Sequence, residues 1–158
     1  MMKILRRIPA RPLKLRRPGA AIGIFDGVHR GHQVILRKAV AMARSIHGTP
    51  VAVTFYPHPL AVLNPKLVPV PLLSLEQRLK AFASCGIRVA LVLPFTRKFS
   101  GWTPEEFVRG VLVDCLKARK VAVGHDFGFG KGRSGSIGTL KDLGGRFGFQ
   151  VYAVGPVT

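Results

Sequence analysis

Two histidines three positions apart, His29 and His32, lie in the run GIFDGVHRGHQ that extends from Gly23 to Gln33. Apolar residues precede an Asp-Gly turn and a helical pattern follows, which places the histidines between a strand and a helix. Backbone N–H groups and the positive end of a helix attract anions at such a point. Imidazole can neutralise charge on a transferred phosphoryl or nucleotidyl group. The run therefore predicts a nucleotide-phosphate site with His29 and His32 as its catalytic residues.

Other interpretations of this run stay open. An H-x-x-H pair can bind a metal ion, but no further Cys, His or Glu partners stand at zinc-like spacing, so we expect no metal ligands in the protein. The histidines could also only form local hydrogen bonds. Asp26 suits the first position of an Asp-Gly turn, with orientation of the site as its alternative role. Gly31 lacks a side chain where a nucleotide must approach the backbone closely.

A second motif, TFYPHP from Thr54 to Pro59, follows another apolar run. His58 stands between two prolines, and each proline fixes its own φ and restricts the residue before it. The motif predicts a preorganised histidine on a binding loop, or else a rigid turn with an incidental histidine. Phe55 and Tyr56 could belong to the core or could stack on an aromatic ligand.

A third motif, GHDFGFGKGRSG from Gly124 to Gly135, is rich in glycine and carries Lys131 and Arg133. Backbone N–H groups of such loops and two nearby cations can bind an anion. The spacing differs from that of a P-loop, so the motif predicts a different kind of phosphate contact.

Short apolar runs alternate with helical patterns along the whole chain. We predict strands over residues 20–25, 50–55, 87–93, 120–123 and 149–154, and helices over 33–47, 74–85, 103–117 and 137–147, with a proline-rich functional loop over 56–73. Serial β-α units predict an α/β fold with a five-stranded parallel sheet and helices on both faces. All three motifs then lie at the carboxyl ends of strands, where such folds bind ligands.

Length and charge limit the function classes. The 158 residues carry 25 Lys and Arg against seven Asp and Glu, a formal charge of +18. We expect a basic arm over residues 1–19 and one domain over 20–158. The charge attracts polyanions, yet basic and aromatic residues do not alternate as in nucleic-acid-binding modules, so nucleic acid is not an expected partner. We expect no membrane span, and two isolated cysteines indicate buried thiols in a reducing cytoplasm.

Taken together, the three motifs resemble the adenylyltransferase module of bacterial FAD synthetase, the riboflavin kinase/FMN adenylyltransferase family. The segments LSLEQRL from Leu73 and PEEFV from Pro104 are also similar to that family, and the resemblance extends from Ala20 to Val157. It implies a Rossmann-like nucleotidyltransferase fold in the cytoplasm. It also implies transfer of AMP from ATP to FMN, giving FAD and pyrophosphate, with Mg²⁺ accompanying ATP. Another nucleotidyltransferase with a different acceptor, or a non-catalytic nucleotide- or nucleic-acid-binding remnant, is the alternative.

The resemblance also implies roles for individual residues. His29 and His32 would stabilise the triphosphate and the transition state. Further expected positions are, for ATP, Gly23, Phe25, Asp26, Gly31, Asp126, Lys131 and Arg133, and, for the flavin, Phe55, Pro57, His58, Phe127 and Phe129. The family's later arginine and Ser-Ser-Thr motif and its riboflavin kinase domain do not occur before Thr158. We therefore expect a truncated module with impaired turnover.

Overall fold

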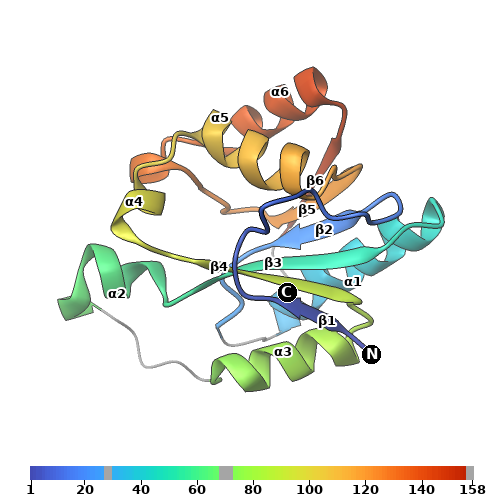
Figure 1. Cartoon of the computed structure of the whole chain (residues 1–158), viewed down its shortest axis with the longest axis horizontal. Helices are drawn as coiled ribbons and strands as arrows, with labels where there is room; N and C mark the ends of the chain where they lie inside the picture. The colour runs from blue at the N-terminus through green and yellow to red at the C-terminus, as the bar shows by residue number, and fades with distance from the viewer. Residues whose placement is uncertain (27–29, 68–72, 156–158) are drawn as a thin grey trace.

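Six parallel strands form one sheet in the order β1-β4-β3-β2-β5-β6 (Figure 1). The structure, a computed structural model, describes residues 1–26, 30–67 and 73–155. Its strands are β1 (Lys3–Leu5), β2 (Gly19–Ile22), β3 (Pro50–Tyr56), β4 (Val89–Pro94), β5 (Lys120–Gly124) and β6 (Gln150–Val154). Its helices are α1 (Arg30–Ser45), α2 (Pro59–Leu63), η1 (Pro65–Leu67), α3 (Leu75–Ser84), α4 (Arg97–Ser100), α5 (Pro104–Phe107), η2 (Val108–Cys115), η3 (Lys131–Arg133) and α6 (Ile137–Phe147).

The predicted parallel α/β fold is confirmed, but the predicted count of five strands is wrong. The sixth strand, β1, comes from the basic arm, and it pairs with β4 through the register Lys3↔Val89 to Leu5↔Leu91. Farther along the arm, the backbone N–H of Leu13 donates to the carbonyl of Cys115. Apolar side chains between the cations, Leu5, Ile8, Leu13 and Leu15, pack against the core. The charge density of the arm concealed this apolar pattern.

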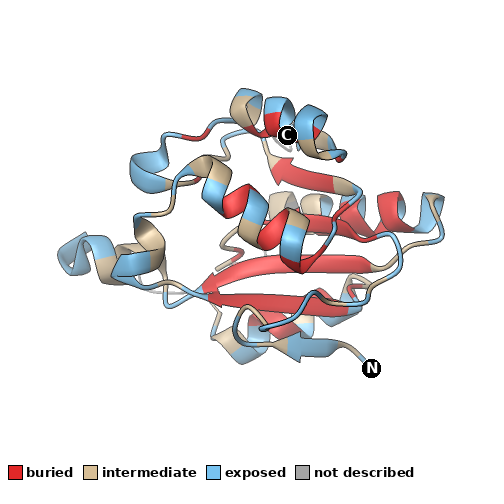
Figure 2. Ribbon diagram, turned by 45° about the horizontal axis from the view of Figure 1, so that its top comes forward, coloured by how far each residue is buried: buried red, intermediate tan, exposed pale blue. Residues whose placement is uncertain are grey.

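The two faces of the sheet have different side chains because successive strand residues point to opposite sides. One face carries Val, Ile and Leu and packs against α5, η2 and α6. The other face carries a row of alanines in register across four strands, Ala90, Ala52, Ala21 and Ala122, each fully buried. These small side chains let α1 and α3 approach closely. Figure 2 shows the central strands coloured as buried and the surrounding helices as buried on part of their surface only.

The predicted starts of the helices at Ser74 and Thr103 are confirmed, whereas α1 begins at Arg30, three residues before the predicted Gln33. Ser74 and Gln77 form a capping box at α3, and Thr103 and Glu106 form another at α5. The helix that starts at Thr103 continues beyond α5 as the π-helical segment η2, which the sequence pattern did not distinguish from an α-helix. The interval 56–73, predicted as one loop, contains the short helices α2 and η1, and its residues 68–72 lie outside the described part.

The end of α1 differs from the prediction that Gly48 closes it. His47 takes the left-handed conformation, with φ of 54°, and the N–H of Gly48 donates to Ala43 at 2.7 Å. A Cβ at position 48 would collide with the backbone carbonyl of Arg17. Gly48 is therefore required for close approach of two segments and not for its own φ.

The two cysteines differ in burial, although both were expected to be buried. Cys115 is buried, and burial raises the pKa of its thiol, whereas Cys85 at the end of α3 is only half-buried. No helix within the described ranges has the length and apolar content that crossing a bilayer requires.

The alanine row generates a stability prediction. Ala52→Val should lower the free energy of unfolding by about 1–3 kcal/mol, because two added carbons would push against α1 in a packed interior. The same substitution at Ala153, which is exposed in β6, is the matched control and should change stability by less than about 0.5 kcal/mol. Urea unfolding of both variants measures the difference, and equal effects would show that the row does not limit the helix-to-sheet distance.

Candidate functional site

The three motifs meet at the carboxyl edge of the sheet. From β2 the chain proceeds to β3 and β4 on one side and then to β5 and β6 on the other, so β2 and β5 are the neighbours at which the strand order reverses. Ligands of open parallel sheets bind outside the carboxyl ends of the strands at this point. The loops after β2, β3 and β5 are the ones that contain the predicted site residues.

The loop after β2 has an unusual backbone conformation. Phe25 has a φ of 53° although it is not glycine, and its side chain is only 1% exposed. The ring folds back beneath Gly23, where an added Cβ would lie 2.9 Å from it. Its edge contacts the rings of His32 and Phe82, each with centroids 5.5 Å apart. Phe25 therefore acts through packing, and its side chain positions His32 at the start of α1.

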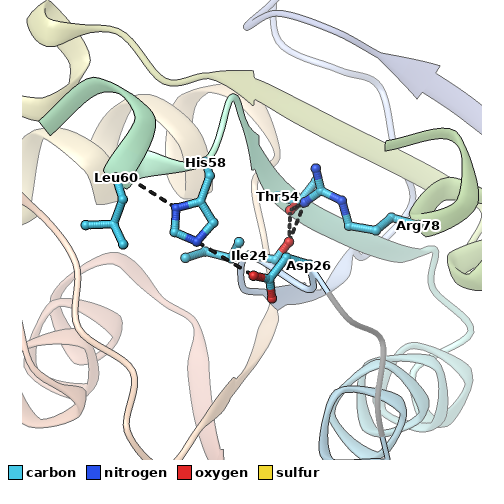
Figure 3. A network of polar contacts seen from close by, with 6 residues as sticks. All are labelled: Ile24, Asp26, Thr54, His58, Leu60 and Arg78. Atoms are coloured by element: carbon cyan, nitrogen blue, oxygen red, sulfur yellow. Dashed lines mark hydrogen bonds and ion pairs between the residues drawn. The ribbon is translucent and has the colours of Figure 1, made fainter. Parts of the chain in front are cut away.

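Helix α3 holds this loop in place through a buried arginine (Figure 3). One terminal nitrogen of Arg78 donates to the carbonyl of Ile24 at 2.5 Å and to the hydroxyl of Thr54 at 3.2 Å. The Thr54 hydroxyl also donates to Ile24, at 2.7 Å. Phe82, one turn after Arg78, contacts the Phe25 ring. One face of α3 thus fixes both the carbonyl before Phe25 and the ring of Phe25.

The charge on Arg78 is held in an apolar interior. Arg78 is 5% exposed, and Thr54 is fully buried. Burial lowers the pKa of Arg78, while the nearby Asp26 carboxylate and, to a smaller extent, Tyr56 raise it. Arginine remains charged throughout the pH range in which proteins fold, so the site contains a permanent buried cation. In the sequence, Arg78 stands among Leu75, Leu79 and Phe82 at helical spacing. This pattern indicates an arginine on the buried face of a helix, a signal that the sequence-based prediction missed.

His58 links the second loop to the first. Its Nδ1 accepts a hydrogen bond from the backbone N–H of Leu60 at 3.1 Å, which caps α2. Its Nε2 lies 3.7 Å from Oδ2 of Asp26. Because Nδ1 is an acceptor, the proton of the neutral ring lies on Nε2 and points toward Asp26 (Figure 3). The ring can therefore donate a hydrogen bond to an anion at this edge.

The aromatic residues of the second loop divide between core and surface. Phe55 is 9% exposed and contacts Phe95, Phe99 and Phe107, so its side chain belongs to the core. Tyr56 is 51% exposed. Pro57 is also exposed and is joined to Tyr56 by a cis peptide bond.

The glycine-rich loop after β5 is folded into a defined shape. Phe129 and Gly135 exchange backbone hydrogen bonds of 3.1 and 2.8 Å. Gly130 has a φ of 76° and lies so close to Pro104 that a side chain would not fit. The guanidinium of Arg133 donates to the carbonyl of Asp126 at 3.0 Å.

The charged side chains of this loop face solvent, and its two phenylalanines differ. Asp126, Lys131 and Arg133 are all exposed. The rings of Phe127 and Phe129 stack 5.4 Å apart, but Phe129 is 6% exposed and contacts Phe107 of the core, whereas Phe127 is half-buried. Phe127 is thus the ring through which this pair can reach a ligand.

At the carboxyl edge of the sheet, Asp26 and His58 are in direct contact. His32 and Gly31 lie at the start of α1, and the glycine-rich loop follows β5, the strand next to β2. His29 lies outside the described residues. Within the described ranges no cluster of three or more His, Cys, Asp or Glu side chains is arranged to hold a metal ion. The arrangement offers N–H donors, cations and helix N-termini to an anionic ligand.

The role of Arg78 can be tested by stability. Arg78→Met should lower the free energy of unfolding by about 1–3 kcal/mol, because the buried Ile24 carbonyl loses a charged donor. Lys80→Met, an exposed change on the same helix, is the control and should have little effect. Urea unfolding gives the total effect, and hydrogen exchange at the amides of residues 23–25 should quicken more than exchange in β6. Uniformly faster exchange would contradict a local role of Arg78.

Comparisons with known proteins agree with this geometry. The family model for FAD synthetase matches residues 13–158. Bifunctional riboflavin kinase/FMN adenylyltransferases are similar: that of Buchnera aphidicola subsp. Schizaphis graminum is 32% identical over 97% of this chain and 49% of its own, and that of Escherichia coli K12 is 35% identical over 82% and 42%. The chain thus spans about half the length of these curated relatives.

Solved structures show the same fold. A protein of Streptococcus pneumoniae described as a macrolide-efflux protein has a TM-score of 0.78 at 26% identity, over 99% of this chain and 52% of its own. Pantoate-beta-alanine ligase of Francisella tularensis has a TM-score of 0.62 at 14% identity, over 100% of this chain and 68% of its own, and this likeness concerns the fold alone. The match of the family model, the curated relatives and the three loops at one edge of the sheet together show that this chain belongs to the FAD synthetase family.

Proposed function

We propose that this chain transfers AMP from ATP to FMN and releases pyrophosphate. In this reaction a phosphate oxygen of FMN forms a bond to the α-phosphorus of ATP, and the bond from that phosphorus to the bridging oxygen of pyrophosphate breaks. The observation that carries the proposal is the convergence of the loops after β2, β3 and β5 at the switch point of the sheet, in a chain of the FAD synthetase family.

His29 and His32 are the proposed catalytic residues, and they act by neutralising charge on the triphosphate. Such transfers need alignment of the reactants and fixed donors near the developing charge more than covalent assistance. The contact of Phe25 with His32 supports this role, because a donor held by packing needs no reorganisation during the reaction. Gly31 would allow the nucleotide to approach the backbone. At Gly23 the missing side chain makes room for the Phe25 ring, and its proposed contact with ATP is through the backbone.

The remaining proposed contacts divide between the two substrates. Lys131 and Arg133 supply exposed cations for the phosphates of ATP, and Asp126 and Asp26 supply carboxylates. His58 donates from Nε2 toward a phosphate that would compete with Asp26. Pro57 and Phe127 offer accessible apolar surface to the flavin, while the buried rings of Phe55 and Phe129 support that surface from below.

Mg²⁺ is proposed to accompany ATP. Asp26 and Asp126 follow neighbouring strands and carry the oxygen ligands that this ion prefers, which fits an ion bound together with substrate phosphates. When bound, Mg²⁺ would offset negative charge on the phosphates. This chain's own residues would orient the nucleotide and exclude competing positions of its phosphate groups.

Formation of FAD from ATP, FMN and Mg²⁺, followed by chromatography, tests the proposal. Parallel assays with pantetheine phosphate and nicotinamide mononucleotide test the acceptor. Of the three acceptors, only FMN is expected to react with ATP. Turnover of another acceptor in place of FMN would overturn the choice of FMN. Absence of any product together with absence of ATP binding by calorimetry would refute nucleotidyl transfer.

His32→Ala should lower kcat about 100-fold, because one donor to the transition state is lost. The free energy of unfolding should change much less than kcat, since the ring is half-buried and not part of the core. Steady-state kinetics and urea unfolding of the same preparation measure both quantities. An unchanged kcat would remove His32 from the mechanism.

Two substitutions at His58 separate its capping role from its donor role. His58→Asn retains a side-chain acceptor near Nδ1 for the Leu60 N–H but loses the Nε2 donor. His58→Gln retains a donor near Nε2 but loses the cap. We expect the asparagine variant to keep the stability of the parent and lose about 100-fold in kcat/KM, and the glutamine variant to be the more active and less stable of the two.

The reverse order of activity in these two variants would contradict a donor role of His58. Equal activity in both would show that the Nε2 position does not contribute to the reaction.

A further inference from the structure

A row of cations lies at the amino edge of the sheet, opposite the proposed active site. Five exposed side chains, Lys3, Arg16, Arg17, Arg88 and Arg119, stand at or next to the amino ends of β1, β3, β2, β4 and β5. We call these five residues the amino-edge row. Their separation in sequence conceals the row, which the parallel topology assembles.

Backbone hydrogen bonds hold the members of the row side by side. The N–H of Lys3 donates to Arg88 at 2.9 Å, and Arg88 in turn donates to Pro50 at 3.0 Å. The carbonyl of Arg16 accepts from Thr49 at 2.8 Å, just before β3. Arg119 donates to Pro18 at 2.9 Å, next to Arg17. The row therefore has a fixed backbone and does not depend on side-chain contacts.

Charge pairing within the protein does not account for the row. The ion pairs of the described residues involve Arg6, His58, Arg109 and Arg146, and none involves a member of the row. Asp114 lines the same hollow as Arg119 but forms none of these ion pairs. The cations are therefore available to an external anion.

Helix dipoles are also too weak to explain the row. Helices α1, α3, η2 and α6 end at this edge, and each C-terminus carries about −0.5 charge, about −2 in all. The row together with Arg44 and Lys117 carries seven positive charges. A direct contact with a helix end is found for Arg17, whose guanidinium donates to Ile46 at 3.4 Å. Roughly four positive charges remain after the helix ends and the Asp114 carboxylate are taken into account.

The length of the row can accommodate several phosphates of a nucleic-acid strand. Four inter-strand steps separate β1 from β5, and at about 4.8 Å each they span about 19 Å. A strand of a duplex carries one phosphate per about 3.4 Å of its axis and an unstacked single strand carries fewer, so up to about five phosphates can face the five cations. Four of the five are arginines, whose planar guanidinium can bind phosphate oxygens through two hydrogen bonds.

A hollow next to the row favours a single strand. It has a volume of about 460 Å³ and lies between Pro12 of the arm and Lys117, Arg119 and Phe147. Apolar side chains, two cations and the Asp114 carboxylate line this space, which can accept an unstacked base that a duplex does not present. Exposed apolar side chains that could enter lipid occur at both edges, since Met1 and Ile4 stand beside Lys3 whereas Tyr56, Leu63 and Leu67 belong to the opposite edge. A membrane surface is therefore the competing partner that the experiment has to separate.

We propose that the amino-edge row binds the phosphate backbone of a single-stranded nucleic acid, at a surface separate from the proposed nucleotide site. The proposal does not depend on nucleotidyl transfer. The interaction is chiefly electrostatic, so its affinity falls with salt, and a strand bound at this edge leaves the opposite edge accessible to ATP.

Fluorescence anisotropy of a labelled 20-residue oligodeoxythymidine tests the proposal. For the intact chain, five phosphate contacts predict a slope of about −3.5 in log affinity against log salt. The triple variant Arg16→Gln, Arg88→Gln, Arg119→Gln should flatten this slope by about 2 and weaken binding about 50-fold at 0.15 M salt, since each lost contact removes a factor of about four.

A triple variant with the same loss of charge is the control. Arg37→Gln, Arg97→Gln, Lys141→Gln neutralises three exposed cations away from the row, and we expect less than a threefold change. Circular dichroism confirms that both triple variants fold. Equal losses in the two triple variants, absence of binding at 0.05 M salt, or displacement of the strand by ATP would each overturn the proposal.

Vesicles of anionic phospholipid form the last arm of the test. Sedimentation of the chain with vesicles that depends on the row, combined with failure to bind the oligonucleotide, would overturn the nucleic-acid assignment. Binding of the oligonucleotide with an ATP-insensitive affinity would support it, whether or not the chain forms FAD.

Discussion

The backbone of Phe25 is held in a conformation that an isolated chain would avoid, and the arrangement of the site depends on it. A positive φ at a bulky residue costs of order 1–3 kcal/mol and persists only where the surroundings impose it. Here α3 imposes it from one face, since Arg78 binds the preceding carbonyl and Phe82 packs against the ring. The same conformation directs the Phe25 ring at His32. The loop geometry therefore reflects the position of a helix more than 50 residues away in sequence.

The carboxyl and amino edges of the sheet differ in the groups that they present, and this difference follows from the parallel topology. Helix N-termini and the motif loops lie at the carboxyl edge, and helix C-termini lie at the amino edge. An anionic substrate is thus attracted to the carboxyl edge by backbone groups together with the side chains of His58, Lys131 and Arg133, whereas the amino edge attracts anions through side chains alone. The two edges can respond differently to salt, because side-chain cations in solvent are screened more than groups that enclose a ligand.

Much of the fold followed from local signals. The capping boxes at Ser74 and Thr103 and the apolar runs of β3 and β4 predicted these elements because their causes lie within a few residues. The positions of His58 and of the glycine-rich loop at one edge followed from the topology. The burial of the Phe55 and Phe129 rings did not follow from local signals, since burial of an aromatic ring depends on what packs against it from elsewhere.

Other features depended on long-range contacts that no local pattern reports. Arg78 looks like one of many cations in a basic chain, and only its place on the inner face of α3 distinguishes it. The left-handed residues Phe25 and His47 are not glycines, so composition gave no signal for them. The amino-edge row joins residues from the arm, from the end of α3 and from the end of η2, and becomes visible only when the sheet is assembled.

Strand β1 affects how far the chain can be truncated from its N-terminus. It is only three residues long, yet as the edge strand it pairs with the backbone N–H and C=O groups on the outer side of β4, and it contributes a lysine to the edge of the sheet. Short, charged border strands discourage intermolecular strand pairing. The family model begins at residue 13, so a protein trimmed to that boundary would present the uncovered β4 backbone to its neighbours in solution. Such a trimmed protein would lose the packing of Leu5 and Ile8 against the core and could self-associate through the exposed edge of β4.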